Sequence, residues 1–149
     1  MKLVLLGAAG SGKGTLAKKI TADFGIPQIS TGDLFREIVK TQSPLGRLVK
    51  SYIDKGALVP NEVTFDVLKN RISQKDCKNG FILDGFPRSL EQAQMLSKLT
   101  DVDAVISVEL DFEEIVKRLV SRRTCPKCGD IDNANYQGFT GNCRKCGTK

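Results

Sequence analysis

The sequence predicts an α/β fold in which helices flank a parallel sheet, with a small separate unit at the end of the chain. Short apolar runs alternate with longer amphipathic segments, which is the pattern of βαβ units. A glycine-rich segment joins the first apolar run to the first amphipathic one. From Thr124 onward the composition changes, because four cysteines and four glycines replace the apolar periodicity. This tail is predicted to fold as a unit of its own.

The predicted elements follow in chain order. The expected strands are Lys2–Leu6, Pro27–Ser30, Gly80–Leu83 and Ala104–Leu110. The expected helices are Lys13–Asp23, Thr31–Thr41, Pro44–Lys55, Asn61–Gln74, Leu90–Leu99 and Phe112–Ser121. Two of these helices fall between strands within residues 30–59, which predicts an insertion on the core.

The first apolar run also resembles the start of a signal peptide. Its strongly apolar part, residues 3–6, is shorter than the roughly 7–15 residues of such a segment, and Lys13 follows soon after. We therefore expect a buried strand and a cytoplasmic protein. No stretch approaches the roughly 18 apolar residues of a membrane span, so no membrane partner is expected.

Composition and charge are those of an ordinary globular protein. Of the 149 residues, 40% are hydrophobic and 27% are charged, and the formal net charge is +6. A basic balance indicates either nucleic acid or a pocket for several phosphates. Because there is no Lys/Arg-rich run and no basic face with interleaved aromatics, we expect no nucleic-acid partner.

The segment Gly7-Ala8-Ala9-Gly10-Ser11-Gly12-Lys13-Gly14-Thr15 follows a predicted strand and opens a predicted helix. Glycines let successive backbone N–H groups face an anion, which the helix N-terminus also favours. Lys13 then reaches the β- and γ-phosphates, and the Thr15 hydroxyl binds phosphate or a magnesium-bound water. A glycine-rich turn without a ligand is the alternative.

Two further segments suit a second phosphate-bearing ligand. Ser30 to Arg36 reads first as a helix start with hydroxyl and carboxylate capping groups. Gly80 to Arg88 is more informative, because a buried strand ends in Asp84 and then turns sharply through glycine and proline. In a doubly wound sheet this strand end faces the ligand crevice, where Asp84 would hold magnesium through water and Arg88 would contact phosphate. A plain turn with a solvated arginine is the alternative.

Together these motifs resemble the adenylate kinase family. The matching segments are GAAGSGKGT, STGDLFR, the turn Gly56–Pro60, LDGFPR with Gln92, and Arg118 with the pair Arg122-Arg123. The resemblance implies a P-loop nucleoside triphosphate hydrolase-like core with a helical monophosphate-binding insertion and a small lid. It also implies reversible transfer of the ATP terminal phosphoryl group to AMP, giving two ADP, with Mg²⁺.

The family's functional residues carry over by position. Lys13, Arg88 and Arg122 are the expected catalytic residues. The expected ATP contacts are Gly10, Ser11, Gly12, Lys13, Gly14, Thr15, Arg118, Arg122 and Ile131. The expected AMP contacts are Thr31, Arg36, Ala57, Leu58, Val59, Gly85, Phe86, Pro87, Arg88 and Gln92. The sequence departs from the family at Ala9, where proline is usual, and at Asp132, where an aromatic residue is usual beside the nucleotide.

Four cysteines have the spacing of a zinc ribbon: Cys125, Cys128, Cys143 and Cys146. Four thiolates leave no open coordination position, so the expected Zn²⁺ is structural and replaces a core that so short a segment cannot build. With zinc bound, the net charge falls to about +4. Disulfides and a nucleic-acid-binding ribbon are the alternatives.

The resemblance divides the chain into residues 1–29 and 60–121 as core, 30–59 as insertion and 122–149 as an incomplete lid. A final strand and final helices of the family are expected to be missing, which would expose a sheet edge. A complete protein is expected to be monomeric. Two alternatives stay open: a kinase for another nucleoside monophosphate, and an inactive nucleotide-binding or zinc-ribbon module.

Overall fold

The computed structural model describes residues 1–149, which form two compact units. The first unit comprises Met1–Gly7 and Lys13–Val108, and the second comprises Ala8–Gly12 and Glu109–Lys149. No helix in either unit combines the length and the apolar character that crossing a bilayer requires.

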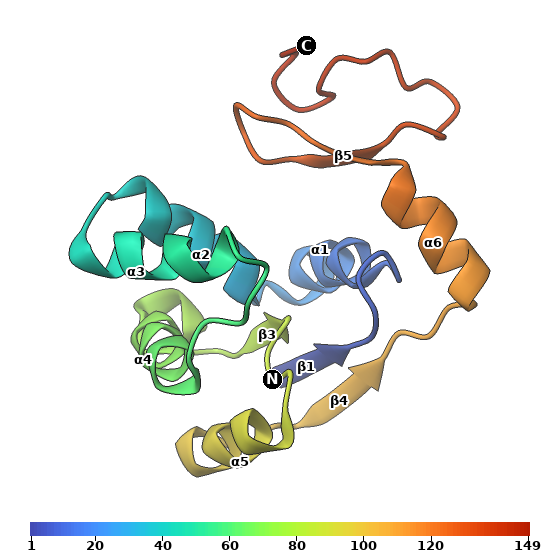
Figure 1. The fold of residues 1–149 in the computed structure, drawn as a ribbon. Helices are drawn as coiled ribbons and strands as arrows, with labels where there is room; N and C mark the ends of the chain where they lie inside the picture. The colour runs from blue at the N-terminus through green and yellow to red at the C-terminus, as the bar shows by residue number, and fades with distance from the viewer. The chain divides into compact units, whose positions relative to one another are not determined.

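The first unit is built on a four-stranded parallel sheet with the order β2-β3-β1-β4. Figure 1 labels β3, β1 and β4 of this sheet. Its strands are β1 (Lys2–Leu6), β2 (Gln28–Ser30), β3 (Phe81–Asp84) and β4 (Ala104–Ser107). Its helices are α1 (Lys13–Phe24), α2 (Thr31–Lys40), α3 (Pro44–Ile53), α4 (Asn61–Ile72), the short 3₁₀ helix η1 (Lys75–Cys77) and α5 (Leu90–Leu99). The predicted parallel α/β core is confirmed.

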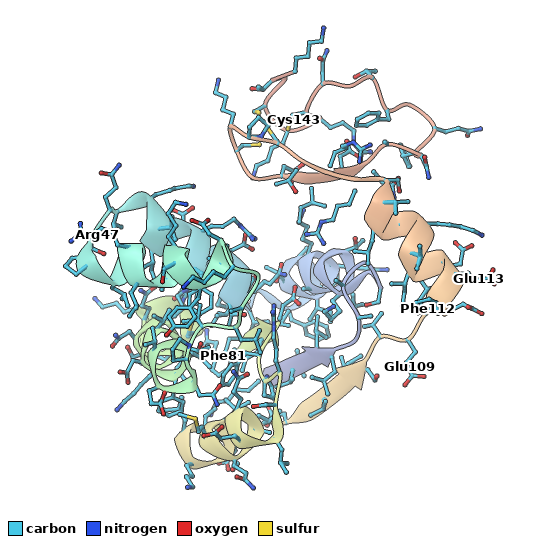
Figure 2. The ribbon with its side chains drawn as sticks, in the orientation of Figure 1. Arg47, Phe81, Glu109, Phe112, Glu113 and Cys143 are labelled. Atoms are coloured by element: carbon cyan, nitrogen blue, oxygen red, sulfur yellow. The ribbon has the colours of Figure 1, made fainter.

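Apolar side chains pack on both faces of this sheet because successive strand residues point to opposite faces. Leu3 and Leu5 of β1 pack with Ala17 of α1 on one face. Val4 packs with Leu83 on the other face, in a cluster with side chains that include Leu68, Phe81, Phe86 and Leu96. Figure 2 labels Phe81 at the start of β3, where only 3% of the residue is exposed. Burial on both faces explains why β1 and β3 read as continuous apolar runs.

Serine residues cap the N-termini of three helices. Ser30, Ser43 and Ser89 each accept a hydrogen bond from the backbone N–H three residues later, at the starts of α2, α3 and α5. This bond satisfies one of the amides that a helix start leaves without an intrahelical partner. The predicted cap at Ser30 is therefore confirmed.

The strand β4 forms an exposed edge of the sheet. It pairs with β1 alone, and Val105 is 59% exposed. It is also shorter than predicted, ending at Ser107 rather than Leu110. The reason is that β1 ends at Leu6, the partner of Ser107, so the residues beyond Val108 have no strand beside them.

The second unit contains α6 (Phe112–Val120) and a two-stranded antiparallel sheet of β5 (Arg122–Thr124) and β6 (Ile131–Asn133). No residue of α6 is buried. Phe112, which Figure 2 labels at the start of this helix, is 76% exposed. The short hairpin was not predicted, because each of its strands has three residues and no apolar alternation. The segment after β6 contains no further helix or strand.

Candidate functional site

The glycine-rich loop connects β1 to α1 with an unusual backbone. Gly7, Gly10 and Gly12 have φ angles of 138°, 83° and 106°, which residues with a Cβ rarely adopt. The Ser11 amide donates to the Ala8 carbonyl at 3.1 Å, and the Ser11 hydroxyl, although buried, has no partner within the protein. A curled backbone with an unpaired hydroxyl fits an anion ligand such as phosphate.

Lys13 opens α1, and its side chain turns back toward the start of the loop. Its Nζ donates to the Gly7 carbonyl at 2.9 Å. The ammonium is therefore held near the N-terminus of α1, which carries a partial positive charge and attracts anions.

A carboxylate lies beside the first turn of the same helix. Asp84 ends β3, and its Oδ2 accepts a hydrogen bond from the Gln28 amide at 3.0 Å. The same oxygen is 4.0 Å from the position that a Cβ on Gly14 would occupy. The carboxylate therefore lies within van der Waals reach of the first turn of α1. Gln28 was not predicted as part of the site, since a lone glutamine on a short strand carries no motif.

The predicted acceptor residues converge on the Gly85 carbonyl. It accepts hydrogen bonds from the Thr31 hydroxyl at 3.0 Å and from Nε of Arg88 at 2.8 Å. Gly85 has a φ angle of 83°, and a Cβ there would lie 3.0 Å from Nη2 of Arg88 and 3.1 Å from the Thr31 hydroxyl. Two segments far apart in the sequence are thereby joined at the carboxyl ends of β2 and β3.

Other predicted acceptor residues have different surroundings. The Arg36 guanidinium pairs with Asp33 beside Gly32 on the first turn of α2. Phe86 is 1% exposed and belongs to the hydrophobic core. The Gln92 side chain accepts from the Arg88 amide at 2.7 Å and donates to Asn61 at 2.8 Å. Its amide group therefore positions the Arg88 backbone, and Asn61 is a partner that no motif had indicated.

The remaining predicted acceptor residues lie in the turn after α3. The Ala57 amide donates to the Tyr52 carbonyl at 3.0 Å, which ties this turn to the end of the helix. Leu58 is 60% exposed, whereas Val59 is buried. Pro87 lies between the buried Phe86 and the exposed Arg88.

In the second unit, loop residues lie close to α6. A Cβ on Gly10 would be 3.4 Å from the Leu119 side chain, and one on Gly12 would be 3.9 Å from Nη1 of Arg118. Among the other predicted ATP contacts of this unit, Arg122 pairs with Asn133 in the hairpin and Ile131 pairs with Thr124. Ile131 is 45% exposed.

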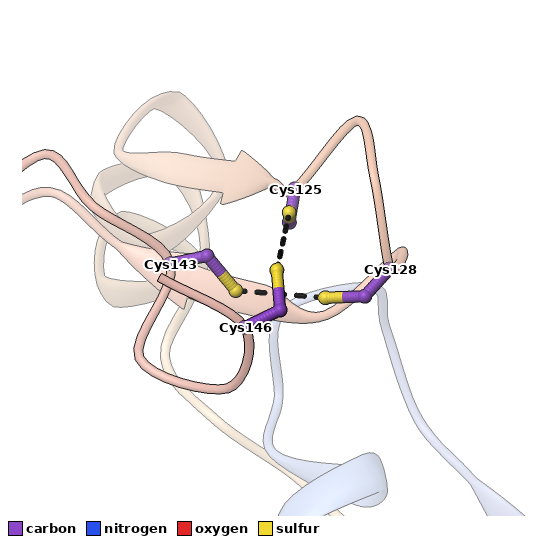
Figure 3. Close-up of side chains that lie close together, drawn as sticks. All are labelled: Cys125, Cys128, Cys143 and Cys146. Carbon is purple, nitrogen blue, oxygen red and sulfur yellow. Dashed lines mark hydrogen bonds between the residues drawn. The ribbon is translucent and has the colours of Figure 1, made fainter. Parts of the chain in front are cut away.

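Cys125, Cys128, Cys143 and Cys146 come together as their spacing predicted. Their sulfur atoms all lie within 4.8 Å of one another, with 3.6 Å between Cys125 and Cys146 and 3.5 Å between Cys128 and Cys143 (Figure 3). All four are free thiols, so the disulfide alternative is not what the structure contains. A tetrahedral zinc–thiolate centre with bonds of about 2.3 Å has sulfur–sulfur edges of about 3.8 Å. The observed spacing fits such an ion.

The pKa values of the thiols in this cluster differ. Hydrogen bonds with Thr148 lower the pKa of Cys146 to about 6. A backbone hydrogen bond from Asp130 acts to lower the pKa of Cys128, but burial and the neighbouring thiols raise it to about 12. Four sulfurs at this spacing cannot all ionise together unless a bound cation compensates the charge.

Replacing one cysteine checks directly whether this cluster binds zinc. We expect the purified chain to contain one zinc ion, and Cys128→Ser to lose it, because three thiolates and a hydroxyl form a weaker site. Metal content by atomic emission and limited proteolysis within residues 122–149, with and without added zinc, measure the effect. Cys77→Ala is the matched control and should retain the metal, since Cys77 is buried elsewhere. Full zinc occupancy in Cys128→Ser would contradict the assignment.

Known proteins resemble this chain over most of its length. The family model described as adenylate kinase matches residues 5–138. An adenylate kinase of Thermodesulfovibrio yellowstonii is 48% identical over 99% of the chain and 72% of its own length. One of Caldicellulosiruptor saccharolyticus is 49% identical over 92% and 66%, and one of Archaeoglobus fulgidus is 48% identical over 99% and 71%. The chain thus spans about two thirds to three quarters of these relatives.

A parallel sheet, a glycine-rich loop with its lysine at a helix start and the matching relatives define a P-loop phosphotransferase. More specifically, the chain belongs to the adenylate kinase family. Its four-cysteine group can hold a metal ion such as zinc.

Proposed function

We propose that this chain transfers the terminal phosphoryl group of ATP to AMP, reversibly, to give two ADP. The observation that carries the proposal lies in the first unit. Lys13 at the start of α1 and the Thr31–Gly85–Arg88 cluster follow the carboxyl ends of neighbouring parallel strands. Ligands of open α/β sheets bind at this edge. Two groups of phosphate-binding residues at one edge suit a donor and an acceptor nucleotide.

The reaction requires positioning and charge neutralisation more than proton transfer. The chain has no histidine, but the acceptor needs no general base. A phosphate monoester has a second pKa near 6 and is therefore largely dianionic at pH 7. In this proposal Lys13 stabilises the negative charge that develops on the transferring phosphoryl group, and Arg88 binds the phosphate of AMP.

The remaining contacts follow the family pattern. We assign ATP to Gly10–Thr15, Arg118, Arg122 and Ile131. We assign AMP to Thr31, Arg36, Ala57–Val59, Gly85–Arg88 and Gln92. Residues 30–59 are proposed as the monophosphate-binding insertion and residues 122–149 as the lid. Arg122 is the third proposed catalytic residue.

The proposal includes two metal ions, Mg²⁺ and Zn²⁺, for which the chain has suitable ligands. Asp84 and the Thr15 hydroxyl are assigned to Mg²⁺ that accompanies ATP, because the Asp84 carboxylate faces the first turn of α1. When bound, this ion neutralises charge on the phosphates. Zinc at the four cysteines has a structural role, since all of its coordination positions are filled by sulfur.

The test is ADP production measured with and without AMP. We expect turnover that depends on AMP, and ATP binding without AMP-dependent turnover would contradict the proposal. A panel of CMP, UMP and GMP as acceptors separates AMP from the other monophosphates. We expect AMP to be preferred, because the relatives that match are adenylate kinases.

Replacing Arg88 with methionine separates the acceptor site from the donor site. The exposed guanidinium is held by the Gly85 carbonyl and is proposed to bind the AMP phosphate in a bidentate way. We expect kcat/KM for AMP to fall by about 10²–10³, by analogy with the loss of one transition-state donor, while ATP binding changes little. Steady-state kinetics with each nucleotide varied measures this. Arg47→Met removes an exposed arginine of α3 and should behave like wild type.

A further inference from the structure

The second cysteine pair is connected to the hairpin by a contact outside the cluster. Arg144 lies between Cys143 and Cys146, and its guanidinium binds the Asp132 carboxylate on β6. Nε donates to Oδ2 at 2.7 Å, and Nη2 donates to Oδ1 at 2.6 Å. Parallel hydrogen bonds of this kind fix distance and orientation together.

Both partners are held by further contacts. Only 11% of the Asp132 side chain is exposed, and its Oδ1 also accepts from the Asn133 amide at 2.7 Å. The Arg144 Cζ lies 4.7 Å from the ring centroid of Tyr136, within the range of a cation–π contact. The Asp132 backbone is paired with Arg123 in the hairpin ladder. Arg144 belongs to the second zinc knuckle, the turn from Cys143 to Gly147, and it is thus held from two sides by Asp132 and Tyr136.

The first zinc knuckle, the turn from Cys125 to Gly129, has the same internal hydrogen bond as the second. The Gly129 amide donates to the Cys125 carbonyl at 2.9 Å, and the Gly147 amide donates to the Cys143 carbonyl at 2.8 Å. Each pair of sulfurs is therefore ordered by its own turn. What a metal ion additionally requires is that the two turns face each other at the correct distance. The Asp132–Arg144 pair connects one turn to the strand that follows the other.

We propose that Asp132, Arg144 and Tyr136 form a clasp that holds the two knuckles in position for zinc, so that these three residues are positioning residues of the metal site. The proposal rests on the metal site and not on phosphoryl transfer.

Electrostatics alone predicts a different result at Asp132. Zinc with four thiolates carries a net charge of −2, so a nearby carboxylate disfavours the site and a nearby cation favours it. Removing the Asp132 charge would then tighten zinc binding or leave it unchanged. If the clasp orders the knuckles, the same change weakens binding. The sign of the effect therefore separates the two explanations.

The experiment is a zinc titration of the full chain, without nucleotide, in competition with a chromogenic chelator. We expect Asp132→Asn and Arg144→Met each to weaken zinc binding about tenfold, as the loss of an outer-shell partner does elsewhere. Lys145→Met is the matched control, because it removes an exposed cation next to Arg144 that has no role in the clasp. It should bind zinc within about twofold of wild type. Equal or tighter binding by Asp132→Asn would overturn the proposal.

Arg144→Lys provides a second, milder test. It keeps the positive charge but loses the planar fork and its stacking on Tyr136. We expect binding weakened by several-fold, whereas a purely electrostatic role predicts wild-type affinity. Saturating Co²⁺ should give the same thiolate charge-transfer band in every variant, because all four ligands are retained. Lys13→Met should bind zinc normally, so a failure of the clasp is distinguishable from a failure of the kinase assignment.

Discussion

Replacing Lys13 with methionine is expected to lower turnover by at least about 10²–10³ without unfolding the protein. The reason is the position of its ammonium group, held 2.9 Å from the Gly7 carbonyl at the start of α1. The methionine side chain is similar in length to the aliphatic part of lysine and can occupy the same space. It offers neither a charge nor hydrogen-bond donors to a transferring phosphoryl group. Initial rates of ADP formation at saturating ATP and AMP measure the effect.

The matched control is Lys19→Met, which removes an exposed lysine from the same helix. We expect it to keep the wild-type rate, and we expect both variants to unfold near the wild-type temperature. A near-normal rate in Lys13→Met would refute the kinase assignment. A parallel loss of rate in both variants would instead point to net charge as the cause.

The largest expected effect on stability is at Gly80, just before β3. Its φ angle is 127°, and a Cβ there would lie 1.9 Å from the Met1 carbonyl oxygen and 2.5 Å from the Met1 nitrogen. That backbone cannot move freely, because the Met1 carbonyl accepts from the Phe81 amide and the Met1 amino group donates to the Asn79 carbonyl. We expect Gly80→Ala to lower the free energy of unfolding by about 3 kcal/mol or more. Urea denaturation measures it.

Gly25→Ala is the matched control for this substitution. Gly25 follows α1 with a φ angle of 66°, and a Cβ there meets nothing within 4 Å. Its cost should be the backbone strain alone, about 1–2 kcal/mol. Equal losses in the two variants would show that the clash with Met1 relaxes and that φ alone determines the effect.

The sequence predicted the core because its strong signals are local and contiguous. The strand β1 and the helix α5 were predicted to the residue, since a buried apolar run or a capped amphipathic segment carries its own boundaries. The strand β3 begins one residue later than predicted, at Phe81, because Gly80 is not extended backbone. Helices α3 and α4 end two residues early, where terminal turns are weakly determined by sequence.

Contacts that join distant segments could not be predicted in the same way. The convergence of Thr31 and Arg88 on Gly85 depends on the register of β2 against β3. The pairing of Asp132 with Arg144 spans a segment without regular structure, where no periodicity relates the two positions. The motifs predicted which residues carry the chemistry, and the fold determines which of these residues meet.

The matching turns at Cys125–Gly129 and Cys143–Gly147 have a kinetic consequence for metal binding. Each presents two sulfurs on a closed turn with a left-handed glycine, with φ angles of 71° and 73°. A zinc ion can therefore bind first to the two sulfurs of either turn, because the two turns have similar geometry. In both cases the final step is the same: the other turn adds its two sulfurs to the ion. Loading and release then have two parallel routes.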